Sequence, residues 1–166
     1  MTEGKPALVC DIHPPGGGAS IRLGSASGED RNLFVSAREL AQWGNLFLSK
    51  GNVDGVQIIP QEVFTLAASI QSPGSLPPGL PRFGFFWWIK TETEEQGCSF
   101  DELGASLPAG SFQILGASGC FCTVIPEQNA VAVRMYNSLD DTGFDYLEDI
   151  RKFGDMAVSS IAQIKE

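Results

Sequence analysis

The chain has 166 residues, of which 43% are hydrophobic, and this is enough apolar material for one domain with a buried core. Its 20 acidic and 11 basic residues give a formal net charge of -9, which repels phosphate backbones and anionic lipid surfaces. We therefore expect neither nucleic acid nor a membrane as a partner, and no apolar run is long enough to span a bilayer.

The beginning of the chain lacks the regular spacing of apolar residues that marks a helix or a strand. Residues 1–33 are rich in Gly, Pro and Ser, with Pro14, Pro15 and Gly16 at their centre, and this composition predicts a loop-rich arm. We expect residues 34–166 to form a single domain. The sequence shows no secretory signal, so the cytoplasm is the default expectation for its location.

Two helices are predicted after this arm. Ser36 and Glu39 have the spacing of a capping box, Leu40, Trp43 and Phe47 then fall on one helical face, and Gly51 provides a stop. Pro60 suits the first turn of a second helix. The apolar residues of that helix repeat at the spacing of a buried stripe: Val63, Leu66, Ala67 and Ile70.

Four segments are predicted to be strands. The aromatic run 83–89 fits a strand that is buried on both faces. Residues 112–115, 120–125 and 130–136 follow, and residues 126–129 suit a tight turn between the last two. Beyond Asp141 a final helix carries its apolar residues on one side: Leu147, Ile150, Ala157, Ile161 and Ile164. These elements predict an α+β fold, in which an antiparallel sheet of about four strands follows two helices and is covered by a C-terminal helix.

The search for a nucleophile gives a negative result. No serine has a lysine three residues later, where a helix would bring the amine beside the hydroxyl. Lys90-Thr91-Glu92 is the nearest match to a Lys-Thr-Gly strand motif, but Glu92 replaces the glycine, so we interpret the triplet as a strand end. Ser118 resembles the serine of a nucleophile elbow, although Cys120 stands where that motif needs glycine.

Two other kinds of site can be assembled from the sequence. Ser118, His13 and Asp11 could form a triad only if the arm folds back over the sheet. The four residues Cys10, His13, Cys120 and Cys122 could hold zinc, but buried cysteines need no metal to explain them. We therefore expect reduced thiols, no metal and no cofactor.

Glycines lie at the end of the predicted strand 112–115. Gly116 and Gly119 have an ordinary structural explanation, because glycine between strands marks a bulge, a turn or a close approach of two backbones. Close approach is also what a substrate-binding edge requires. The tryptophans of the chain, Trp43, Trp87 and Trp88, are interpreted first as core residues, and a pocket wall remains the alternative.

Three stretches of the sequence resemble the class C β-lactamase-like serine hydrolases, a penicillin-binding-protein-like family that includes esterases, D-aminopeptidases and aminohexanoate-oligomer hydrolases. Residues 36–48, continued to Pro60, look like the helix-loop-helix that precedes the sheet strands of that family. Residues 83–88 look like the first of those strands. Residues 112–119, followed by 124–137, are similar to the strand that carries the third catalytic motif of the family and to the hairpin after it.

This resemblance implies that only the C-terminal portion of such a hydrolase is present. The Ser-x-x-Lys and Tyr-x-Asn motifs of the family are missing, and the cation or histidine often found in the third motif would fall near Ile114. We therefore expect no catalytic residue. The resemblance makes Gly116, Ala117, Ser118 and Gly119 the candidate substrate-binding residues.

Three hypotheses about function follow. The first is a fragment or degenerate relative of a serine hydrolase, inactive alone, whose exposed seam is covered by the missing N-terminal part or by a second copy in a homodimer. The second is a small-ligand-binding or oligomerisation module that uses the groove at the sheet edge. The third keeps enzyme activity through Ser118 or the Cys120 thiol.

Overall fold

The computed structural model describes residues 35–76, 82–91, 103–116, 120–135 and 145–164. The predicted loop-rich arm 1–33 lies outside these residues. The helices of the described part are α1 (Ala37–Leu48), α2 (Gln61–Ala67) and α3 (Tyr146–Ile164), with a short 3-10 helix, η1 (Pro126–Gln128), between the last two strands. The predicted α+β fold class is confirmed.

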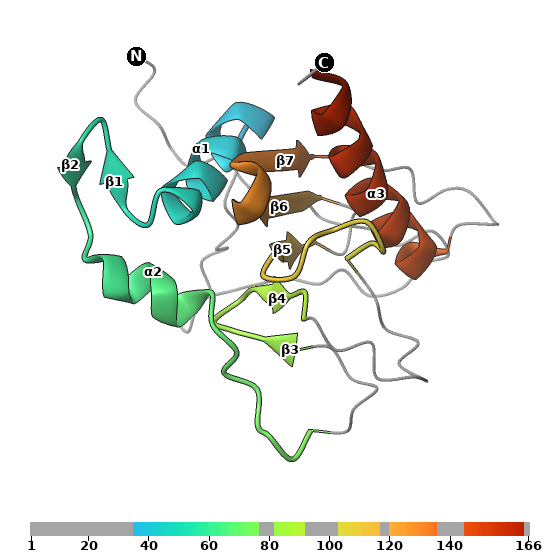
Figure 1. The fold of residues 1–166 in the computed structure, drawn as a ribbon, viewed down its shortest axis with the longest axis horizontal. Coiled ribbons are helices and arrows are strands. Elements are labelled where there is room, and N and C mark those ends of the chain that lie inside the picture. The colour runs from blue at the N-terminus through green and yellow to red at the C-terminus, as the bar shows by residue number, and fades with distance from the viewer. Residues whose placement is uncertain (1–34, 77–81, 92–102, 117–119, 136–144, 165–166) are drawn as a thin grey trace, which may run out of the picture.

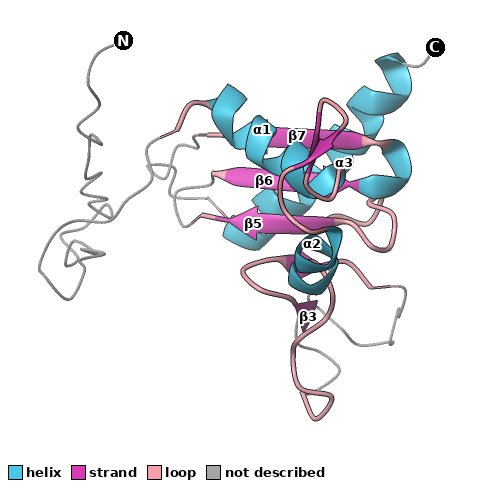
Figure 2. Cartoon of the chain, turned by 90° about the vertical axis from the view of Figure 1, so that its left-hand side faces the viewer, coloured by secondary structure: helices cyan, strands magenta, loops and turns pink. Residues whose placement is uncertain are grey.

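The strands form a five-stranded antiparallel sheet and a separate small hairpin (Figure 1). The sheet has the order β3-β4-β5-β6-β7, and its strands are β3 (Arg82–Phe83), β4 (Trp88–Ile89), β5 (Phe112–Leu115), β6 (Phe121–Ile125) and β7 (Ala130–Arg134). The hairpin consists of β1 (Asn52–Val53) and β2 (Val56–Gln57). Figure 2 shows the longer strands β5, β6 and β7 side by side, with β3 at the far end of the sheet beside α2.

Alternation along the strands divides the core into two layers. Phe112, Cys122 and Val124 face α1 and pack with its residues and with Trp87. On the opposite face, Ile125 packs with Leu103, with Leu107 and with side chains of α3. The half of the sheet formed by β5 to β7 is therefore covered on both faces.

Helix α1 begins as the sequence predicts. The Ser36 side chain accepts a hydrogen bond from the backbone N–H of Glu39, the Glu39 carboxylate accepts one from the backbone N–H of Ser36, and these contacts lower the pKa of Glu39. The predicted core position of Trp43 is wrong, because its ring is about half exposed. Gly44 points at the sheet instead, and a Cβ there would meet a Val131 methyl at 2.6 Å. The missing side chain lets the helix approach the sheet closely.

The predicted burial of α2 is also wrong. The helix exists, but Val63, Leu66 and Ile70 are about half exposed, and the buried residue is Phe64. Phe64 packs edge-on against Phe47 of α1 with 4.9 Å between ring centroids. Phe64 thus anchors the helix on its buried side, and Val63 and Leu66 of the predicted stripe face outward.

The aromatic run 83–89 is not one strand. It forms β3 and β4 with a tight turn between them, in which the Gly84 N–H donates to the Trp87 carbonyl at 2.8 Å. Trp87 is buried, whereas Phe85 and Phe86 are exposed. Because one predicted strand is in fact two, the sheet has five strands rather than about four.

Helix α3 closes the second face of the sheet (Figure 1). Ile150 is fully buried as predicted, while Ile164 near the end of the helix is exposed. Gly154 lies directly against the segment before β5, where a Cβ would come within 1.8 Å of the Leu103 carbonyl oxygen. None of the helices in the described residues is both long enough and apolar enough to cross a membrane.

Candidate functional site

The outer edge of β5 is only partly paired. Strand β4 pairs Ile89 with Phe112 and Trp88 with Gln113, and the chain before Trp88 then turns back toward β3. Ile114 and Leu115 therefore have no neighbouring strand on this side among the described residues. On the inner side all four residues of β5 pair with β6. The result is an open sheet edge that begins in the middle of β5.

The hydrogen-bond pattern of the sheet shows which backbone groups point to this edge. The Gly116 N–H donates inward to the Cys120 carbonyl at 2.8 Å, and the Ser111 carbonyl accepts outward from the Lys90 N–H at 2.8 Å. Successive residues of a strand alternate between the two sides. The N–H and C=O of Leu115 consequently point outward, to the unpaired edge. Such groups can bind an extended peptide-like ligand as an added strand would.

Of the candidate substrate-binding residues, Gly116 lies at the end of this edge. A Cβ at Gly116 would lie 3.0 Å from the Cys120 carbonyl oxygen, so the glycine has the structural role of allowing a close turn into β6. Ala117, Ser118 and Gly119 lie outside the described residues. The open backbone of Leu115 was not predicted, because residues 83–89 were interpreted as one continuous strand.

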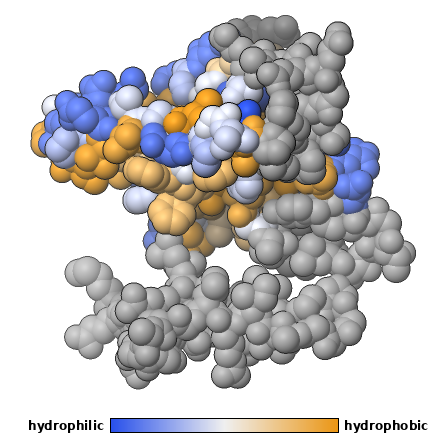
Figure 3. Space-filling view, turned by 90° about the horizontal axis from the view of Figure 1, so that it is seen from below, coloured by the Kyte–Doolittle hydropathy of each residue, from blue (hydrophilic) through white to orange (hydrophobic). Residues whose placement is uncertain are grey.

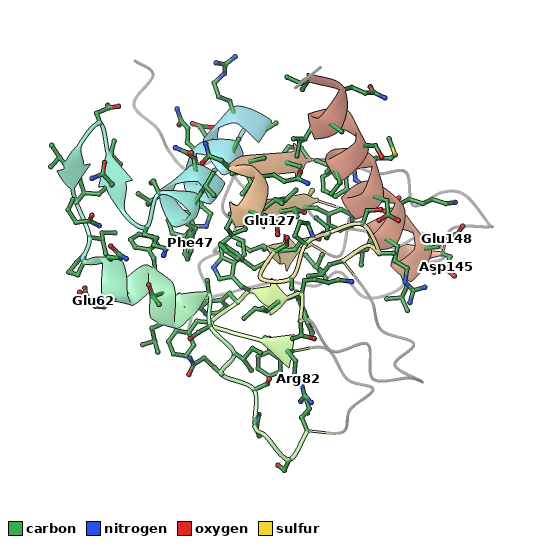
Figure 4. The ribbon with its side chains drawn as sticks, viewed as in Figure 1. Phe47, Glu62, Arg82, Glu127, Asp145 and Glu148 are labelled. Carbon is green, nitrogen blue, oxygen red and sulfur yellow. The ribbon has the colours of Figure 1, made fainter. Side chains whose placement is uncertain are left out.

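The described side chains of the edge itself, Ile114 and Leu115, are apolar and cannot act as an acid or a base. Ile114 is half-buried and packs into the α1 layer of the core, as its apolar character requires. Phe47, which Figure 4 shows between α1 and α2, belongs to the same layer and packs against Trp87 with ring centroids 4.6 Å apart. Lys90 lies at the end of β4, so the prediction of a strand end is confirmed.

The two cysteines of the described residues are both free thiols. Burial raises the pKa of the Cys122 thiol to about 11, so this group stays protonated and unreactive near neutral pH. Cys122 faces the carbonyl of Leu40 in α1 at 3.7 Å, and the Cys120 thiol donates to the carbonyl of Met135. Neither thiol has a basic side chain as a hydrogen-bond partner in these contacts, and Cys122 is therefore a poor nucleophile.

Acidic side chains do not gather into a site within the described residues. Glu62, Glu127 and Glu148 lie on α2, η1 and α3, well apart (Figure 4). In that part of the chain, no group of three or more His, Cys, Asp or Glu side chains could hold a metal ion. Cys10 and His13, which the zinc and triad hypotheses need, lie outside the described residues.

A polar group that sequence reasoning did not identify lies on the α3 face of the sheet. Gln113 of β5 and Thr123 of β6 are cross-strand partners, and both are fully buried. Within the described part of the chain, the Gln113 amide and the Thr123 hydroxyl have no hydrogen-bond partner, and neither has the hydroxyl of buried Ser111. Because this face is opposite to the α1 layer and closed by α3, the group costs stability without forming an accessible site.

The sequence of the chain matches one curated protein of much greater length. No family model matches the chain. An uncharacterized protein of Alkalihalophilus pseudofirmus is 41% identical over 155 residues, which are 93% of this chain and 45% of that protein. The chain thus spans less than half the length of this curated relative.

Two solved structures resemble the chain. A protein named as a 6-aminohexanoate-dimer hydrolase of Bacillus anthracis aligns with a TM-score of 0.54 and 21% identity, over 79% of this chain and 29% of the other. A β-lactamase of Mycobacterium bovis aligns with a TM-score of 0.52 and 20% identity, over 75% and 43% of the two chains. The chain has a β-lactamase-like fold. In both comparisons this β-lactamase-like portion corresponds to less than half of the longer protein.

Proposed function

We propose that the chain is the C-terminal portion of a β-lactamase-like serine hydrolase, which contributes a substrate-binding sheet edge and is inactive alone. The observation that carries the proposal is the outer edge of β5 at Leu115, next to Gly116, which no strand of the described residues pairs. It is supported by the fold shared with two proteins whose names state hydrolase or β-lactamase activity. The sequence supplies no Ser-x-x-Lys pair that could act at this edge.

The reaction expected of the completed enzyme is acyl transfer. A hydroxyl of the other part would attack the carbonyl carbon of an amide or ester, while a neighbouring amine takes the hydroxyl proton. The C–N or C–O bond of the substrate then breaks, and the amine or alcohol leaves with that proton while the acyl group stays on the hydroxyl oxygen. The edge of β5 holds the substrate by pairing its backbone with the N–H and C=O of Leu115. This portion of the chain therefore orients the substrate, and the other part of the enzyme supplies the nucleophile.

Covalent labelling tests the proposal. The 166-residue chain is incubated with a fluorophosphonate and with a penicillin-type probe, and its intact mass is measured. We expect no adduct on the chain alone, and an adduct on the other part once a Ser-x-x-Lys-bearing segment of a relative is added. An adduct on Ser118 or Cys120 of the isolated chain would instead establish the third hypothesis.

A binding or oligomerisation module is the second candidate, and one observation favours it. Strand addition at the open edge of β5 needs only backbone N–H and C=O groups, so this edge could bind an extended ligand or the edge of a second copy without any nucleophile. Thermal stabilisation by short peptides, without hydrolysis, would support ligand binding. Light scattering that gives twice the chain mass would support a homodimer.

A further inference from the structure

Exposed apolar side chains concentrate at the β3–β4 end of the sheet. Six of them form what we call the α2 patch: Val63, Leu66, Ile70, Phe83, Phe85 and Phe86. Viewed from below, hydrophobic residues cover much of the surface on the side where α2 and the β1–β2 hairpin lie (Figure 3). Single exposed apolar residues are common on soluble proteins, whereas a contiguous group marks a surface that contacts something else.

Backbone hydrogen bonds hold the two parts of the α2 patch together. The Phe85 N–H donates to the Ala67 carbonyl at the end of α2, at 3.0 Å, and the Gln71 N–H donates to the Phe83 carbonyl at 2.9 Å. Gly84 lies so close to α2 that a Cβ would come within 2.2 Å of the Ala67 carbonyl oxygen. The β3–β4 turn is thus fixed against the helix, and the patch is a preformed surface.

Phe86 is the most exposed member of the α2 patch. Its ring is 91% exposed, and its φ of 66° lies in the left-handed region that bulky residues rarely adopt. The neighbouring Trp87 is 1% exposed, so the turn buries one aromatic ring and presents the next to solvent. The turn therefore accepts backbone strain at a residue whose large ring it presents to solvent.

The α2 patch lies beside the open edge of β5. Trp88 pairs with Gln113, so a continued strand would have placed residues 87 and 86 opposite Ile114 and Leu115. Instead the chain turns away there, and this turn both leaves Leu115 unpaired and presents Phe86. A polypeptide docked on the α2 patch would therefore reach the edge where substrate is expected.

We propose that the α2 patch is the docking surface for the nucleophile-bearing part of the hydrolase. This inference rests on the proposed function, and it adds the surface through which the two parts join. The length of the relatives argues for this occupant: the matched region is 45% of the Alkalihalophilus pseudofirmus protein and 29% of the Bacillus anthracis chain. Each of them has further polypeptide that could cover such a patch.

The test uses the 166-residue chain co-expressed with the segment of the Alkalihalophilus pseudofirmus relative that lies outside its match. The complex is purified through a tag on the segment, and its dissociation constant is measured. Two variants reduce the patch: Phe86→Asn, because asparagine tolerates a positive φ, and Leu66→Gln on the surface of α2. The matched control is Met156→Gln, an exposed apolar residue on the far helix α3.

We expect a complex with one copy of each part, which Phe86→Asn and Leu66→Gln each weaken about tenfold or more and Met156→Gln does not change. Circular dichroism melting checks that all variants remain folded. A complex that both patch variants leave equally tight overturns the inference, although the proposed function would stand if that complex reacts with the covalent probes. A complex that depends on the patch but never reacts would uphold the docking surface and refute the hydrolase.

Two further results would also overturn the inference. One is the absence of any complex with the segment. The other is a dimer of the 166-residue chain alone that Phe86→Asn converts to a monomer, measured by light scattering, because the occupant would then be a second copy.

Discussion

The two ends of the sheet differ in how they are built. Strands β5 to β7 have four or five residues each and are covered by α1 on one face and α3 on the other. Strands β3 and β4 have two residues each, and the helix beside them, α2, buries Phe64 but turns Val63 and Leu66 outward. The closed end contains most of the buried core and hence most of the stability. The open end contains the unpaired edge of β5 and the α2 patch.

Two adjacent residues differ most between the buried and the exposed parts of the molecule: Trp87 is buried and Phe86 is exposed. Replacing buried Trp87 by alanine removes its contacts with Phe47 and Phe112, and we expect a loss of about 4 kcal/mol in the free energy of unfolding. Urea unfolding followed by circular dichroism measures this. A loss below about 1 kcal/mol would mean that the α1 layer does not depend on the open end.

A substitution at Gly154 should disturb the packing of α3 on the second face of the sheet. Alanine normally favours a helix over glycine by about 1 kcal/mol, but here the added Cβ would be forced against the Leu103 carbonyl oxygen. We expect Gly154→Ala to lower the free energy of unfolding by about 3 kcal/mol. Ser160→Ala on the exposed side of α3 is the control and should not reduce stability. Equal stability of the two variants would contradict the tight packing of α3 against residues 103–107.

The helix and strand boundaries that sequence could predict are those set by local chemistry. The capping box of Ser36 and Glu39 specifies where α1 begins, and the turn residues 126–129 between two apolar runs specify the β6–β7 hairpin. The exposure of α2 could not be predicted, because periodicity shows that Val63 and Leu66 share a face but not whether anything covers it. Gly84 was a usable signal, since glycine inside an apolar run often marks a bend.

The candidate site was predictable only in part for the same reason. Gly116 could be identified from its position after an apolar strand. The open edge at Leu115 depends on where β4 stops pairing, and that depends on the contact between Gly84 and the end of α2. Such a contact joins segments that the sequence alone does not bring together.

The buried state of the closed end can also be tested by pH. The pKa of the Cys122 thiol is raised from 9.0 to about 11, so the unfolded chain releases this proton first as the pH rises. The contribution of the protonated Cys122 thiol to the free energy of unfolding is complete below pH 9 and is lost between pH 9 and about 11. This corresponds to about 2–3 kcal/mol, because each pH unit of difference is worth about 1.4 kcal/mol. Urea unfolding at pH 8 and pH 11 should show this extra loss in the natural chain but not in Cys122→Ala, and parallel losses would contradict it.

The smallest expected change in the free energy of unfolding is an increase, and it comes from replacing Phe86 at the open end. Phe86 loses little by replacement because its ring is 91% exposed, and its positive φ costs about 1–2 kcal/mol for a bulky side chain. Phe86→Asn should therefore raise the free energy of unfolding by about 0.5 kcal/mol, visible as a melting temperature about 1–2 °C higher. A matched change at a residue with ordinary φ, Phe83→Asn, should bring no such gain. A lower melting temperature for Phe86→Asn would show that its ring stabilises the isolated chain, and the contrast with Trp87 would then disappear. A higher one would show that folding alone favours asparagine over Phe86, so the ring is not retained for the stability of the isolated chain.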